Sequence, residues 1–314
     1  MKAIMYHYVR PFNPDLPGLN HLHIDDFRKQ LDYFEENYGF VSKADFEKAF
    51  VTGDIPEGVV LTFDDGLKCH YDYVLPELKS RGLWGFFFIT TGIYQTNDLL
   101  GVHKIHILLG AIDHKKIYDQ LHEIVTPEML SDKGMDGFTT SYSLITDDNE
   151  YSMEVKRTLN FYIAYEFRSR IIDQLLELNN LSHYNNVADF YVNHAEIQSL
   201  NDAGMIVGSH TVNHFVMSKL NVEDQALEIK ESMKYLENIC PDIPYRSFCY
   251  PYGGPHTFTN ESEAVLAAND FKLAFSLDNV DIIQSNISNQ PFALSRYDCN
   301  AYPYGQLRKV MISK

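Results

Sequence analysis

Most of the chain alternates strand-like apolar runs with segments in which apolar residues recur every three or four positions. Trp84–Ile89 is continuously apolar, as is typical of a strand buried on both faces of a parallel sheet. Phe27, Leu31 and Phe34 have helical spacing and predict a helix over 24–37. The same reasoning predicts strands at 2–9, 40–41, 59–63, 205–208, 247–250, 272–277 and 293–298, and helices at 43–50, 69–81, 193–204, 222–238 and 260–268. The pattern therefore predicts an α/β fold.

The alternation stops between residues 93 and 188, where the pattern predicts mainly helices. We expect helices at 102–112 and 114–125, a loop over 126–150, and one long helix over 151–178 because that segment contains no Pro or Gly. The remaining residues are enough for a single α/β barrel. We therefore expect a barrel formed by 1–92 and 189–314, with a helical insertion at 93–188.

Charge and composition exclude several classes of protein. The chain has 26 Lys and Arg against 43 Asp and Glu, a net charge of −17, which disfavours binding to nucleic acid or anionic lipid. Four cysteines in 314 residues are too few for a disulfide scaffold, and no apolar run has the length of a membrane span. The first residues read as a strand rather than a signal peptide, so we expect a cytoplasmic protein.

Three polar motifs follow predicted strands, where a parallel barrel collects its catalytic groups. They are Asp64-Asp65, His210-x-x-x-His214, and the turn Tyr250–Gly254. One Asp and two His suit a hydrolytic metal site, for Zn²⁺ or else Co²⁺ or Ni²⁺. The rigid turn could hold the Tyr252 backbone N–H as an oxyanion donor. Each motif alone is more often a simple turn or a chance His pair; their joint occurrence favours a site.

Leu61-Thr-Phe-Asp-Asp-Gly66 together with Gly208-Ser-His-Thr-Val-Asn-His214 resembles the polysaccharide deacetylases, the NodB-homology proteins of carbohydrate esterase family 4. The resemblance implies a distorted, TIM-like (β/α) barrel with fewer than eight strands. It also implies a divalent metal held by Asp65, His210 and His214, with Asp64 as the catalytic base. The family's Pro-Tyr-Gly motif matches Pro251, Tyr252 and Gly253, which would contact the substrate, as would the nearby His256.

The sequence departs from the common family pattern at two positions. Cys249 stands where many members have an Arg that braces the base, and the last strand, Leu294–Asp298, lacks the usual acid His. Both departures resemble the branch that includes the poly-N-acetylglucosamine deacetylases, whose acid His lies in an N-terminal Tyr-His-x-Val motif. Tyr6-His7-Tyr8-Val9 matches that motif, which implies that His7 is the acid. We expect Arg296 to replace the missing Arg near Asp64, and Asp298 to orient a neighbouring group at the substrate site.

Together with these residues, the resemblance implies a metal-dependent hydrolase that removes N-acetyl groups from an N-acetylhexosamine-containing glycan or glycan precursor and releases acetate. Two alternatives stay open: an amidase of the same fold that acts on a small non-sugar amide, and a glycan-binding module without catalysis. The expected partner is a carbohydrate substrate rather than nucleic acid or a membrane. The insertion is the expected contact for a second copy of the chain or for a glycan-synthesis partner.

Overall fold

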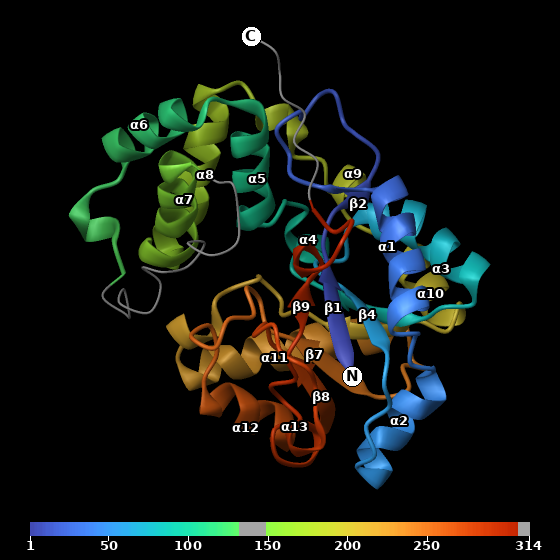
Figure 1. The fold of residues 1–314 in the computed structure, drawn as a ribbon. Helices are drawn as coiled ribbons and strands as arrows, with labels where there is room; N and C mark the ends of the chain where they lie inside the picture. Colours follow the sequence, from blue (N-terminus) through green and yellow to red (C-terminus); the bar gives the residue numbers. More distant parts are fainter. Residues whose placement is uncertain (132–148, 307–314) are drawn as a thin grey trace. The chain divides into compact units, whose positions relative to one another are not determined.

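The computed structural model describes residues 1–131 and 149–306, and most of its strands form one parallel sheet (Figure 1). The sheet has seven strands in the order β8-β7-β6-β5-β4-β1-β9, and β2 and β3 form a separate pair. The strands are β1 Lys2–Tyr6, β2 Val9–Arg10, β3 Leu22–His23, β4 Val59–Phe63, β5 Gly85–Ile89, β6 Ile206–Ser209, β7 Arg246–Cys249, β8 Phe271–Phe275 and β9 Tyr297–Asp298.

The sheet curls until its two ends meet at the segment that leads into β9. Phe275 of β8 forms a parallel bridge with Leu294, and Tyr297 of β9 then pairs with Ile4 of β1. This arrangement confirms the predicted distorted TIM-like barrel with fewer than eight strands. The closure also brings the end of the first strand beside the last strand.

The two faces of the sheet belong to two hydrophobic clusters. Alternate strand residues such as Leu61, Phe63 and Phe87 pack with α1, α3, α10, α11 and α12 on the outer face. Their neighbours, such as Val60 and Phe86, form a second cluster on the inner face. Because successive side chains of a strand point to opposite faces, residues two positions apart in a strand lie on the same face.

Among the described residues, the barrel unit contains nine α-helices, and six of them lie where a helix is predicted. The nine helices are α1 Ile24–Asn37, α2 Lys43–Thr52, α3 Leu75–Arg81, α4 Ile93–Thr96, α9 Val187–Phe190, α10 His194–Asp202, α11 Val222–Ile239, α12 Asn260–Ala268 and α13 Gln284–Asn289. Asn193 and Glu196 form the capping box at the start of α10. Gly82 ends α3 with a φ of 66°, a conformation that glycine adopts without strain.

The chain divides into two compact units, of which the second is helical. The barrel unit comprises Met1–Pro11, His21–Thr96 and the described residues from Ala188 onward, and the helical unit comprises Phe12–Asn20 and Asn97–Val187. The helical unit contains α5 Gly101–Ala111, α6 His114–Ile124, α7 Glu150–Arg157 and α8 Tyr165–Leu178. Its N-terminal segment is tied in by a hydrogen bond from the Gly18 N–H to the Gly110 carbonyl.

The prediction of a single helix over 151–178 is wrong. After α7 the chain forms a π-helical turn at Thr158–Tyr162 and then becomes extended at Ile163 and Ala164. Ile163 pairs with Leu130 in an antiparallel bridge, and the Ala164 N–H bonds to the Met129 carbonyl. This pairing with a distant segment replaces the helical hydrogen bonds, which periodicity alone cannot reveal. The loop predicted over 126–150 contains a short 3₁₀ turn at Pro127–Met129, and its part from 132 to 148 lies outside the described residues.

Candidate functional site

Side chains alternate between the two faces along each strand, and this alternation places the motif residues on the inner face at one end of the sheet. Asp64 continues the inner-face positions Val60 and Thr62 of β4, and His210 continues Ile206 of β6. Cys249 is the inward-facing last residue of β7, and His7 directly follows β1. Because the strands are parallel, these residues meet at the carboxyl end of the barrel, where (β/α) barrels place their active sites.

The structure brings Asp65, His210 and His214 together around one point. Oδ1 of Asp65 lies 3.4 Å from Nε2 of His210 and 3.3 Å from Nε2 of His214. All three side chains are buried, and one ligand atom from each lies within 4.8 Å of the others. Two imidazoles and a carboxylate that converge in this way fit a divalent metal such as Zn²⁺.

A neighbouring carbonyl fixes the orientation of His210. Its Nδ1 lies 2.7 Å from the Cys249 backbone oxygen, which can only accept a hydrogen bond. Nδ1 therefore carries a proton, and Nε2 points toward Asp65. Metal-binding histidines are commonly oriented by such a bond.

Helix α11 supports the loop that carries both histidines. The carboxylate of Glu228 accepts hydrogen bonds from the backbone N–H groups of Val212 and Asn213 at 2.9 and 2.8 Å, and another from the Asn213 side chain at 2.5 Å. Inside the loop, the His214 N–H bonds to Oγ1 of Thr211 at 2.9 Å. These bonds fix the path of the chain between the two imidazoles.

Backbone strain is concentrated around this group of side chains. Asp65, Thr211, His214 and Tyr252 have φ values of 75°, 68°, 56° and 64°, in the left-handed region that costs non-glycine residues energy. Such conformations persist where the surrounding structure enforces them, and they cluster at functional sites.

Asp64 is held by the guanidinium of Arg296, which directly precedes β9, a strand separated from β4 by β1 alone. Nη1 and Nη2 of Arg296 donate to its two carboxylate oxygens at 2.7 and 2.8 Å, and both side chains are almost completely buried. The Arg296 fork is itself fixed by Oγ1 of Thr62 and the Ser276 carbonyl. Burial alone would raise the pKa of Asp64, but the charge and hydrogen bonds of Arg296 outweigh it and lower that pKa to about 2.

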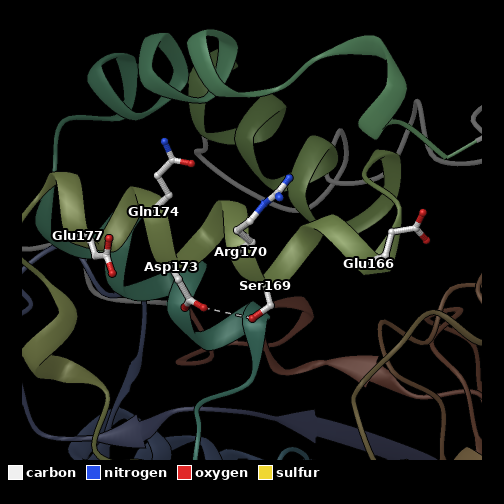
Figure 2. Close-up of a pocket in the computed structure, with 6 residues that line it drawn as sticks. All are labelled: Glu166, Ser169, Arg170, Asp173, Gln174 and Glu177. Carbon is white, nitrogen blue, oxygen red and sulfur yellow. Dashed lines mark hydrogen bonds between the residues drawn. The ribbon is translucent and has the colours of Figure 1, made fainter.

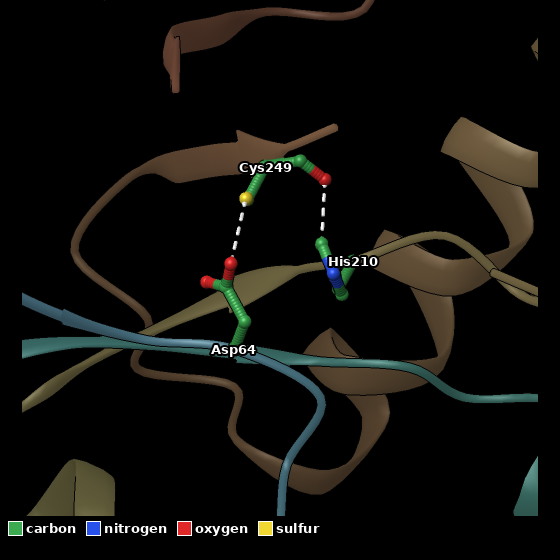
Figure 3. Close-up of side chains that lie close together, drawn as sticks. All are labelled: Asp64, His210 and Cys249. Carbon is green, nitrogen blue, oxygen red and sulfur yellow. Dashed lines mark hydrogen bonds between the residues drawn. The ribbon is translucent and has the colours of Figure 1, made fainter. Parts of the chain in front are cut away.

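Cys249 adds a third contact to Asp64. Its Sγ lies 3.6 Å from Oδ2 of Asp64 (Figure 3). Asp64, His210 and Cys249 also have the donor types and spacing of a metal site. A cation is disfavoured there, however, because Arg296 already places a positive charge on both carboxylate oxygens. The thiol is therefore best described as a neighbour of the Asp64 carboxylate.

His7 lies at the rim of the same group. Its Nε2 is 4.0 Å from Oδ2 of Asp65, and 40% of its side chain is exposed to solvent. The imidazole thus borders both the Asp65 group and the solvent from which a substrate would approach.

The other predicted site residues lie at varying distances from this centre. Tyr252 is adjacent to it, since its ring centroid is 5.0 Å from that of His214, and Pro251 and Gly253 flank it in the turn after β7. His256 is exposed, and its backbone carbonyl accepts a hydrogen bond from Oγ of Ser218. Asp298 caps the turn that follows β9 by accepting from the Asn300 N–H. The structure therefore gives Asp298 a local capping contact, and its expected role at the substrate stays a prediction.

Three contacts of the site were not predicted from the sequence. They are the contact of the Cys249 thiol with Asp64, the hydrogen bond between Arg296 and the Thr62 hydroxyl, and the hydrogen bond from the His70 ring to the His7 carbonyl. The position of Thr62, two residues before Asp64, was a usable signal because it places both side chains on one face of β4. The other two contacts join segments far apart in the sequence, and nothing local marks them.

A separate hollow lies along α8 in the helical unit (Figure 2). It is lined by Glu166, Ser169, Arg170, Asp173, Gln174 and Glu177, all from that one helix. None of the motif residues lines it, so we attach no chemistry to it.

The family model described as polysaccharide deacetylase matches residues 169–275 of this chain. The matched range includes His210, His214 and the turn around Tyr252, and it begins after Asp64 and Asp65. This match confirms the resemblance indicated by the motifs and supports a carbohydrate N-deacetylase, which is a hydrolase. The sequence matches no curated protein.

Three solved structures share the fold of this chain. The Streptococcus pyogenes deacetylase PplD, in complex with acetate, aligns with a TM-score of 0.57 and 16% identity over 95% of this chain and 91% of its own. IcaB from Ammonifex degensii aligns with a TM-score of 0.54 and 17% identity over 95% and 90%. A de-N-acetylase from Aggregatibacter actinomycetemcomitans gives 0.52 and 13% over 94% and 93%. At these identities the likeness establishes the shared fold.

Among residues 1–131 and 149–306, we find no helix with the length and hydrophobicity of a membrane span.

Proposed function

We propose that the protein is a metal-dependent hydrolase that removes N-acetyl groups from an N-acetylhexosamine-containing glycan or glycan precursor. The observation that carries the proposal is the buried Asp65, His210 and His214 group with the Arg296-braced Asp64 directly beside it. The match to the polysaccharide deacetylases adds the substrate class.

Asp65, His210 and His214 are the residues we assign to the metal. A divalent metal held by these side chains would act as a Lewis acid on the carbonyl of the acetamide. Asp64 stays ionised at neutral pH because of Arg296, so its carboxylate is free to accept a proton. We assign to Asp64 the role of accepting a proton from the water that attacks the carbonyl carbon.

Two further groups complete the reaction. The backbone N–H of Tyr252 is the donor we assign to the oxyanion that develops on the acetamide oxygen. His7 gives a proton to the sugar nitrogen as the C–N bond breaks, because an amine leaves poorly unless it is protonated. The products are acetate and a glucosamine-type amine, and proton exchange with solvent restores Asp64 and His7.

The test is acetate release from N-acetylglucosamine oligomers by metal-loaded protein, chelated protein and the isosteric variant Asp64→Asn. We expect release by the metal-loaded wild type alone. Full activity after exhaustive chelation would refute the metal requirement. Hydrolysis of a small cyclic ureide without acetate release would favour the non-sugar amidase, and oligomer binding without release would favour the binding module.

A further inference from the structure

Three successive carbonyl groups at the end of β1 are each held by a different element. The Tyr6 carbonyl accepts from the Asp64 backbone N–H at 3.0 Å, and the Tyr8 carbonyl accepts from the Leu22 N–H at 2.9 Å. Between them, the His7 carbonyl lies 2.8 Å from Nε2 of His70. Since a carbonyl oxygen cannot donate, Nε2 carries the proton and donates it. His7 is thus anchored by a side chain, where its two neighbours are anchored by backbone.

The surroundings of His70 are poorly suited to a polar ring. His70 is fully buried, and its ring centroid lies 5.5 Å from that of Phe63 and 6.0 Å from that of Phe87. Within the described residues, its Nδ1 has no hydrogen-bond partner. An unpartnered buried polar atom costs about 1–3 kcal/mol, so an apolar side chain would suit this position better for stability alone. A residue that lowers stability in this way is typical of a functional position.

The local backbone also singles out His70. It begins a π-helical turn, His70–Val74, which continues into α3, and such turns occur frequently at functional sites. Its backbone N–H bonds to the Leu67 carbonyl at 2.9 Å, which ties it to the turn that follows Asp64 and Asp65. Burial lowers the pKa of His70 to about 4, so at neutral pH the ring has one N–H, and that group points to His7.

We propose that His70 is a positioning residue that sets the place of the His7 imidazole beside Asp65 by holding the His7 carbonyl. Because 40% of the His7 side chain is exposed, packing covers only part of it, and the backbone anchor adds to its positioning. The inference rests on the proposed function, since the anchor has a catalytic consequence only if His7 is the proton donor. A displacement of about 1 Å is enough to lower a rate on the order of 10²-fold.

The first experiment compares His70→Gln with His70→Met, two side chains of similar size and shape. The Gln amide can donate to the His7 carbonyl and the Met thioether cannot. We expect His70→Met to lower kcat on the order of 10-fold to 10²-fold with KM within about twofold. His70→Gln should restore most of kcat. Metal content and thermal unfolding, measured on both variants, report whether the barrel is intact.

The second experiment is a double-mutant cycle with His7→Ala. If His70 acts through the His7 imidazole, His70→Met should lower kcat in the wild type and leave the kcat of His7→Ala unchanged. A purely structural role would lower kcat by the same factor in both backgrounds. If His70→Met does not fold, His70→Asn replaces it, because its shorter amide falls short of the carbonyl.

The outcomes separate this inference from the proposed function. Near-normal kcat for His7→Ala would show that His7 is not the proton donor, and it would overturn both that part of the proposed function and this inference. A large loss for His7→Ala with near-normal kcat for His70→Met would leave the proposed function standing and overturn the inference. Equal activities of the Gln and Met variants would also overturn it.

Discussion

At the scale of the residue, Arg296 supplies both charge and geometry to Asp64. Its two parallel hydrogen bonds fix the plane of the carboxylate, and its charge keeps that carboxylate ionised within the barrel. The pair is fully desolvated, so removing either partner leaves a buried charge without compensation. The cost of breaking it therefore includes stability as well as activity.

Arg296→Met should abolish most of the activity. Without the guanidinium, burial raises the pKa of Asp64 and favours its protonated form, which cannot act as a base. We also expect a loss of about 3–5 kcal/mol in the free energy of unfolding. Acetate release and urea denaturation measure the two effects. Arg246→Met is the matched control, since Arg246 pairs with the half-exposed Glu237, and it should leave kcat near normal.

His7→Ala should keep the fold and the metal and lose on the order of 10²–10⁴ in kcat. The physical reason is that the amine leaving group needs a proton, and His7 is the imidazole at the rim of the site. Kinetics with N-acetylglucosamine oligomers and metal analysis check this expectation. His256→Ala is the comparison: if that variant were inactive and His7→Ala active, the acid would be His256.

The residue scale also shows what the sequence could reveal. The grouping of Asp65, His210 and His214 follows from their places after parallel strands, and the expectation that Arg296 lies near Asp64 follows from the absent Arg at Cys249 together with the resemblance. The thiol contact of Cys249 and the ring bond of His70 depend on distances across the barrel, which no local pattern encodes.

At the scale of the element, α11 supports the site from outside the barrel. One carboxylate on this helix holds two successive backbone N–H groups of the loop between the motif histidines. Thr211 and His214 in this loop have left-handed backbone conformations, which cost energy. The loop therefore needs such external support to hold both imidazoles in place.

Glu228→Ala should weaken metal binding by about 10–100-fold, as expected when a group that orients ligands is lost. Titration of the metal-free protein with Zn²⁺ against a competing chelator measures the affinity. Glu231→Ala is the matched control, because Glu231 is an exposed residue on the same helix. Equal affinities in the two variants would show that the loop holds its shape without Glu228.

Prediction of the elements succeeded where their signals are local. The helix α1 was predicted from its apolar spacing, and its core residues Phe27, Leu31 and Phe34 are all buried. The helix expected over 151–178 failed because its interruption depends on pairing between Ile163 and Leu130. In the same way, Phe12–Asn20 belongs to the helical unit, where Gly18 bonds to Gly110. No local pattern in the sequence predicts that long-range contact.

At the scale of the whole molecule, closure of the barrel is what assembles the site. Asp64 follows β4, Arg296 lies in the segment before β9, and His210 and His214 lie in the loop after β6. The alternation of strands and helices was sufficient to predict the fold class. It could not predict the register that closes β8 onto Leu294, because that register is set by packing inside the barrel.

The last prediction concerns the stability of the whole fold against acid. Burial lowers the pKa of His70 from its ordinary value of 6.5 to about 4. Between these values the unfolded chain binds a proton that the folded protein does not, so the free energy of unfolding falls as the pH drops from 6.5 to 4. This group alone accounts for a loss of about 3 kcal/mol, which is complete near pH 4 and absent above pH 6.5.

Urea unfolding of the wild type and of His70→Gln, both kept metal-free with chelator, measures this contribution from pH 4 to 7. The Gln side chain does not titrate, so the stability of the variant should fall less steeply with decreasing pH. Because the other titrating groups are common to both proteins, their effects cancel in the difference between the two curves. Parallel curves across this range would show that His70 takes up its proton as readily in the folded barrel as in the unfolded chain.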